Sequence, residues 1–193
     1  MTPLQPKTAL LGVLTLAYPL AVYFGVGHFQ PRWMALLLLG LAVLRLWVTR
    51  QPFWLAAAAG ALCLALLSIW GNAWMPLKLY PVLVNAVLLA VFATSLAYPP
   101  TAIERIARLT EPDLPVQGVT YTRQVTWVWC VFFLCNGSAA LATAVWASPA
   151  VWALYNGLLA YVLMGLLFAG EWLVRRRVKA RWQAGAKAQE AHG

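Results

Sequence analysis

Six runs of predominantly apolar residues divide the chain, and they cover approximately residues 8–26, 33–49, 53–70, 79–97, 125–147 and 150–173. A helix that crosses the hydrocarbon core of a membrane needs about 20 mostly apolar residues, within a range of about 17–25. None of the runs shows the alternation of apolar and polar positions that a β-barrel needs, whereas a helix satisfies its own backbone groups in lipid. The pattern therefore predicts an all-α integral membrane protein with six transmembrane helices.

The basic residues predict how these spans are oriented. Six spans place both termini on the same side of the membrane. That side would hold 12 of the 14 Lys and Arg residues, and only Arg32 and Lys78 would lie on the other side. Positively charged loops remain in the cytoplasm, so both termini are predicted to be cytoplasmic. The first run follows Lys7 as in a signal peptide, but it lacks a small-x-small cleavage site and is interpreted as a retained span.

Composition supports the membrane class and excludes others. Hydrophobic residues make up 63% of the chain and charged residues only 10%, with a mean hydropathy of +0.73. A soluble domain carries about 25% charged residues, so a soluble domain, a disordered chain and a disulfide scaffold are all excluded. The net charge of +9 follows the topology, which makes nucleic-acid binding unnecessary as an explanation. We expect one polytopic membrane domain over residues 1–193, with a basic cytoplasmic tail at 174–193.

Residue types that carry catalysis are scarce. The two histidines are His28, in a predicted outer loop, and His192, in the tail. The three cysteines are Cys63, Cys130 and Cys135; all lie within spans and are expected to be small buried apolar residues. The sequence contains no HExxH, Cys-x-x-Cys, G-x-S-x-G or His-x4-Asp motif. We therefore expect no catalytic residue, no metal and no cofactor; an acyltransferase that uses substrate-assisted chemistry is a minor alternative.

The loop at 98–124 carries the clearest local signals. Pro99-Pro100 ends the fourth span, and Thr101-Ala-Ile-Glu104 has the spacing of a capping box that starts a short helix. Glu104 and Arg108 stand four residues apart in the favourable order. We expect a short interfacial helix on the cytoplasmic face. Its Glu104, Arg105 and Arg108 form either a docking surface for a soluble partner or a purely structural connector.

Charged residues near the inner ends of the spans suggest a pocket. Arg45 in span two and Glu171 in span six lie at matching depths, so they could pair across helices. Together with Tyr121 and Arg123 they would rim a cavity that opens toward the cytoplasm. Two alternatives stay open: Arg45 extends to the lipid headgroups, or Glu171 pairs with Arg175 one turn later.

Three asparagines lie inside predicted spans. Asn136 is at the centre of span five, and Asn85 and Asn156 are in the outer halves of spans four and six. An amide in lipid must find a partner, which is either another helix or a ligand. We favour contacts between helices.

The basic tail suggests contact with lipid. Arg175, Arg176, Arg177, Lys179 and Arg181 follow span six directly. Basic residues at this position set topology and attract anionic headgroups.

A resemblance adds a functional context. The segments PPTAIERIARLTEPDLP, YTRQVTWVWCVFFLCNGSAA and LYNGLLAYVLMGLLFAGEWLVRRRV cover most of the C-terminal half. They resemble a family of small bacterial inner-membrane proteins encoded among aryl-polyene and related type II fatty-acid or polyketide synthase genes, beside acyl carrier proteins. The resemblance implies a location in the bacterial inner (plasma) membrane and a role in making or handling an acyl chain; it assigns no catalytic residues.

These observations leave two functions open. The leading hypothesis is a non-catalytic accessory protein that helps a cytoplasmic acyl-carrier-protein pathway synthesise, tether or deliver its lipid-like product. Its partners would be membrane lipids and acyl carrier protein or synthase subunits. The alternative is a small transporter or flippase for a lipid or another hydrophobic substrate, with Arg45, Glu171 and Asn136 along its path.

Overall fold

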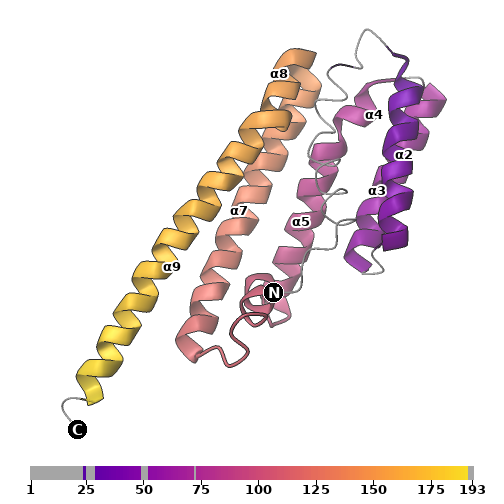
Figure 1. Cartoon of the computed structure of the whole chain (residues 1–193). Coiled ribbons are helices and arrows are strands. Elements are labelled where there is room, and N and C mark those ends of the chain that lie inside the picture. Colours follow the sequence, from indigo (N-terminus) through magenta and orange to yellow (C-terminus); the bar gives the residue numbers. More distant parts are fainter. Residues whose placement is uncertain (1–23, 25–28, 49–51, 72, 191–193) are drawn as a thin grey trace. The chain divides into compact units, whose positions relative to one another are not determined.

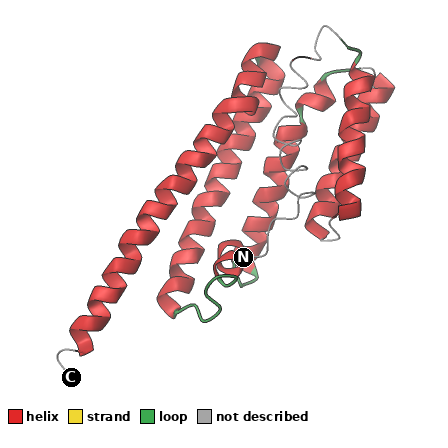
Figure 2. Ribbon diagram, viewed as in Figure 1, coloured by secondary structure: helices red, strands yellow, loops and turns green. Residues whose placement is uncertain are grey.

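The computed structural model describes residue 24 and residues 29–48, 52–71 and 73–190, and every regular element in this part of the chain is a helix (Figure 2). The elements are α2 (Pro31–Val48), α3 (Pro52–Gly71), α4 (Met75–Lys78), α5 (Tyr80–Ala97), α6 (Ala102–Ala107), α7 (Val116–Trp146), α8 (Pro149–Leu154), the π-helix η1 (Tyr155–Leu159) and α9 (Ala160–Glu190) (Figure 1).

Three stretches of described helix are long and apolar enough to cross a membrane. They are Tyr80–Ala97, Val116–Trp146 and Pro149–Trp182, which overlap the predicted fourth, fifth and sixth spans. Helices α2 and α3, of 18 and 20 residues, cover the second and third predicted runs. Apart from residue 24, the first run lies outside the described residues. The all-α class and the membrane-spanning character are thus supported, whereas the number of six spans and their orientation stay predictions.

Two helix boundaries differ from the predictions. Helix α7 begins at Val116 rather than at residue 125, because Pro115 ends the preceding loop in an extended conformation and every residue after it can continue a helix. Helix α9 continues to Glu190, so the predicted tail is helical over most of its length. Its Ala, Arg, Lys and Gln residues are strong helix formers, which explains why the helix continues beyond the apolar segment.

The chain divides into two compact units, Met1–Leu158 and Leu159–Gly193, and the division falls inside η1. In the first unit α2 packs against α3, and α5 packs against α7 (Figure 1). The core of the α2–α3 pair is built largely of small residues, which allow the helix axes to approach closely. These buried residues are Ala35, Leu38, Ala58, Ala61 and Ala65.

Aromatic rings fill one part of the α5–α7 contact. Phe92 on α5 meets Phe133 on α7 edge to face, with ring centroids 5.2 Å apart. Trp129 lies 5.5 Å from Phe133 and 6.4 Å from Phe92, centroid to centroid. Such aromatic contacts contribute beyond the apolar area they bury, so this cluster fixes α5 against α7.

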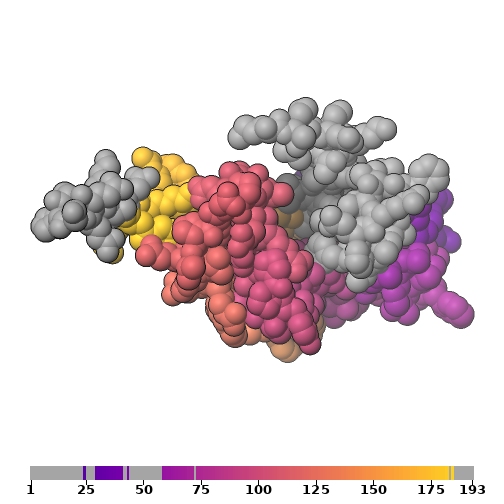
Figure 3. All heavy atoms as spheres, turned by 90° about the horizontal axis from the view of Figure 1, so that it is seen from below, coloured from indigo at the N-terminus to yellow at the C-terminus, as the bar shows by residue number. Residues whose placement is uncertain are grey.

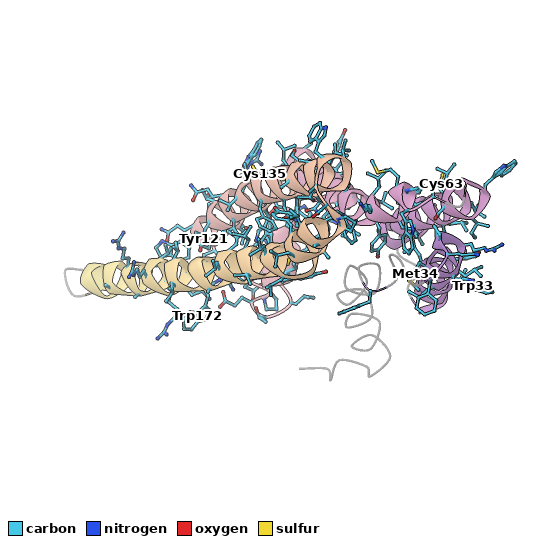
Figure 4. All side chains as sticks on the ribbon, turned by 90° about the horizontal axis from the view of Figure 1, so that it is seen from above. Trp33, Met34, Cys63, Tyr121, Cys135 and Trp172 are labelled. Atoms are coloured by element: carbon cyan, nitrogen blue, oxygen red, sulfur yellow. The ribbon has the colours of Figure 1, made fainter. Side chains whose placement is uncertain are left out.

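The second unit consists of α9. Within it, Glu171 and Arg175 form an ion pair one helical turn apart, with Oε2 and Nη2 2.6 Å from each other. The guanidinium of Arg176 lies over the ring of Trp172, 4.8 Å from its centroid. The Trp172 side chain projects from the helix (Figure 4).

Candidate functional site

Helix α6 begins with the predicted capping box. The hydroxyl of Thr101 accepts a hydrogen bond from the backbone N–H of Glu104 at 3.3 Å, and the Glu104 carboxylate accepts from the Thr101 N–H at 3.4 Å. Ser95, near the end of α5, accepts a further bond from the N–H of Ala102 at 2.9 Å. These three bonds satisfy N–H groups at the start of a helix that is only 6 residues long. The prediction of a capped helix in this loop is confirmed.

Glu104 and Arg108 close the loop that carries α6. The Glu104 carboxylate accepts from Nε and Nη2 of Arg108 at 2.9 and 2.8 Å. The remaining guanidinium nitrogen, Nη1, donates to the carbonyl of Pro112 at 2.9 Å. Because Glu104 is only 5% exposed, this carboxylate is an internal anchor of the loop, not a group that a partner can reach.

The outer surface of α6 has a different character. We call this surface the α6 patch; it consists of Arg105 and Ile106 on α6 and of Leu109 in the turn that follows the helix. Ile106 is 58% exposed and Leu109 is 83% exposed. The Nε of Arg105 donates to the carbonyl of Pro100 at 3.0 Å, and the side chain is exposed. The segment between α5 and α7 lies at the molecular surface in the view from below (Figure 3).

A chain of hydrogen bonds links Asn85, Asn136 and Tyr155, and we call these three residues the amide cluster. The phenol of Tyr155 donates to Oδ1 of Asn136 at 2.9 Å, and Nδ2 of Asn136 donates to Oδ1 of Asn85 at 3.0 Å. Nδ2 of Asn85 then donates to the carbonyl of Pro81 at 2.8 Å. The chain joins α5, α7 and η1 through side chains that lie within predicted spans. Every member is satisfied by protein, as a polar group in lipid requires.

Close approach of α5 and α7 makes the amide cluster possible. Gly137, next to Asn136, faces α5, and a Cβ atom added there would lie 3.0 Å from the Cβ of Asn85. A side chain at this position would therefore require Asn85 to move by a few tenths of an ångström. The absence of a side chain at Gly137 permits the close approach at which the two amides bond to each other.

A second set of polar contacts, within the first unit, holds α8 and η1 to α7 and to the end of α4. Nδ2 of Asn156 donates to Oγ1 of Thr143 at 3.2 Å and to the carbonyl of Trp152 at 2.9 Å. The indole N–H of Trp152, whose side chain is fully buried, donates to the carbonyl of Lys78 at 3.2 Å. The π-helical turn places Tyr155 and Asn156, which are adjacent in sequence, each against a different residue of α7.

The predicted pocket of Arg45, Tyr121, Arg123 and Glu171 stays a prediction. The side chain of Arg45 lies outside it, and Glu171 belongs to the second unit, where it pairs with Arg175. Tyr121 (labelled in Figure 4) is half-buried and Arg123 is exposed on α7. Residues two positions apart in a helix leave it about 200° apart, so these two side chains face nearly opposite directions. The cross-helix pair of Arg45 and Glu171 stays a prediction.

Cysteine burial differs from expectation. Cys130 is buried, but Cys63 and Cys135 are exposed on their helices (Figure 4). The expectation of buried cysteines is therefore wrong for these two. They lie on outward faces of helices that are apolar enough to contact lipid, where a thiol behaves as a small apolar group. Among the described residues no group of three or more His, Cys, Asp or Glu side chains is close enough to hold a metal.

Sequence reasoning missed several contributors to these sites. Tyr155 donates to Asn136, and Thr143 accepts from Asn156. Ser95 accepts from the first residue of α6, the helix that carries Glu104. Tyr155 had a usable signal, because it adjoins Asn156 and a phenol inside a span needs a hydrogen-bond partner. For Ser95 and Thr143 there was no such signal, since both hydroxyls can also bond to their own helix.

Comparison with known proteins does not assign the chain to a family. No family model matches the chain, and neither a curated protein nor a solved structure matches it. The resemblance to proteins of aryl-polyene gene clusters therefore stays a prediction.

Proposed function

We propose that this protein is a non-catalytic accessory of the bacterial inner membrane, with six spans and both termini in the cytoplasm. It would dock a carrier protein of an acyl-chain pathway at the cytoplasmic face. The observation that supports this most is the α6 patch: Arg105 and Ile106 are exposed on a helix whose inner side is fixed by buried hydrogen bonds, and Leu109 is exposed in the turn that follows it.

Preorganisation suits the α6 patch to protein binding. The capping box and the bond from Arg108 to Pro112 hold the loop in one conformation before a partner arrives. A surface that is already ordered loses little conformational entropy on binding, so more of the contact energy contributes to affinity.

Apolar contact, rather than a broad electrostatic field, would supply most of the affinity. Residues 98–124 contain three basic and three acidic residues, so the loop carries no net charge. Arg105 provides one exposed cation for an acidic partner, and Ile106 and Leu109 provide contact area. A few central residues of this kind carry most of the energy of an interface.

The test is binding of purified acyl carrier protein, in its acylated form, to the full chain in lipid nanodiscs. We expect wild type to bind, and the variant Ile106→Ser/Leu109→Ser to bind at least about tenfold more weakly. Arg105→Glu should reduce the association rate, because it repels an acidic partner. The matched control is Arg32→Glu, which makes the same charge change on α2, on the predicted opposite side of the membrane.

Two results would overturn the docking function. One is wild-type protein that binds no carrier protein although it is folded. The other is uptake or flipping of a lipid by the purified chain in liposomes, which would favour the transport alternative.

A further inference from the structure

The arginines that follow the last apolar segment differ in whether their guanidinium groups have partners within the protein. Arg175 is engaged by Glu171 through two hydrogen bonds, with Nε to Oε1 at 2.8 Å and Nη2 to Oε2 at 2.6 Å. Arg176 covers the face of Trp172. Each of these two guanidiniums is thus already bound, one turn back along its own helix.

Arg177 and Arg181 are placed differently. Both are exposed, and within the described part of α9 neither has an ion pair or a ring contact. They stand four residues apart, which puts them on the same face of the helix about 6 Å apart along its axis. Two like charges at this spacing repel each other, and an anion between them would relieve that repulsion.

We propose that Arg177 and Arg181 form a binding site for the phosphate of an anionic phospholipid. A guanidinium can donate two parallel hydrogen bonds to a phosphate, and two guanidiniums one turn apart can hold one phosphate from both sides. We expect Arg175 and Arg176 to contribute less, because Glu171 neutralises the charge of Arg175 and the guanidinium of Arg176 is held over the ring of Trp172.

Apolar neighbours favour a lipid over a soluble phosphate. Val174 is exposed and lies on nearly the same face as Arg177 and Arg181, on the side that leads back to the apolar part of α9. A phosphate held by the two arginines would therefore place its acyl chains along the apolar part of the helix. Trp172 and the arginines together mark where this helix leaves the hydrocarbon.

The experiment uses the full chain in nanodiscs of phosphatidylcholine with an increasing share of phosphatidylglycerol. Native mass spectrometry counts the anionic lipids retained by wild type, by Arg177→Gln/Arg181→Gln and by the matched control Arg175→Gln/Arg176→Gln. Both variants remove two arginines from the same short stretch of α9. We expect retention to fall roughly fivefold or more in the first variant and less than about twofold in the second.

Equal losses in the two variants would overturn the site and indicate a diffuse basic field. No loss in either would overturn it as well. Competition by millimolar inorganic phosphate would assign the pair to a soluble anion instead of a lipid. If the glutamine variant does not fold, Arg177→Lys/Arg181→Lys keeps the charge but loses the paired hydrogen bonds, and we expect it to retain lipid at an intermediate level. The proposal is independent of carrier-protein docking, since it involves no residue of the α6 patch.

Discussion

The amide cluster and the α6 loop both bury polar groups, but they do so in different surroundings. Asn136 lies within an apolar helix, and its partners Asn85 and Tyr155 are side chains of other elements. Glu104 lies between two predicted spans, and its partners come from its own short helix and cap. Contacts in the amide cluster span α5, α7 and η1, whereas those of Glu104 are made within eight consecutive residues, from Thr101 to Arg108.

This difference predicts different consequences when a partner is lost. A group released in lipid finds no water, so the neighbouring helices must rearrange to satisfy it. A group released at the loop can be hydrated instead. We therefore expect substitutions in the amide cluster to cost more than those at α6, and substitutions at the exposed end of α9 to cost least.

The largest effect is expected for Asn136→Leu. It removes the partner of both Asn85 and Tyr155, and we expect it to lower the free energy of unfolding in detergent micelles by about 1.5 kcal/mol. Ser138→Ala is the matched control on the same helix, because the Ser138 hydroxyl is exposed and bonds only to the carbonyl of Leu134. Equal losses for the two variants would contradict a special role for the amide cluster.

Glu104→Gln should have a smaller effect, about 1 kcal/mol, because it removes the charge of the ion pair but keeps the shape of the side chain. Hydrogen exchange of residues 102–108 measures it locally, and we expect faster exchange there while α5 and α7 are unchanged. Asp113→Asn, at an exposed position of the same loop, is the control. Unchanged exchange in Glu104→Gln would show that the loop does not depend on this pair.

Thr143→Val tests whether Asn156, which has two hydrogen-bond acceptors, tolerates the loss of one of them. Asn156 loses one acceptor but keeps the carbonyl of Trp152, so we expect a loss of only about 0.5 kcal/mol in the same unfolding assay. A loss as large as that of Asn136→Leu would indicate that the number of remaining partners does not matter, which would break the comparison above.

The smallest effect is expected at Glu171 and Arg175. The Arg175 side chain is 47% exposed, so a double-mutant cycle with Glu171→Gln and Arg175→Gln should give a coupling energy of about 0.4 kcal/mol. The same cycle with Arg45→Gln in place of Arg175→Gln tests the pair across helices. Coupling of Glu171 to Arg45 that exceeds its coupling to Arg175 would support the predicted pocket.

Local sequence signals were sufficient to predict the hydrogen bonds that hold the α6 loop. The spacing of Thr101 and Glu104, and of Glu104 and Arg108, predicted bonds that involve residues three and four apart, so no tertiary information was needed. The direction in which each side chain faces was not predictable in this way. Burial of Glu104 and exposure of Ile106 depend on how α6 lies against α5 and α7.

The sequence by itself determined the helical class, most helix positions and the membrane character, because these follow from the length of each apolar run and from turn and cap residues close in the chain. It also identified Asn85, Asn136 and Asn156 as groups that need partners. Only the tertiary structure decided which partners they have. Asn85 and Asn136 are 51 residues apart in sequence, and their bond depends on the close approach of α5 and α7 at Gly137. Such a contact is set by the packing of two helix surfaces, which no local pattern records.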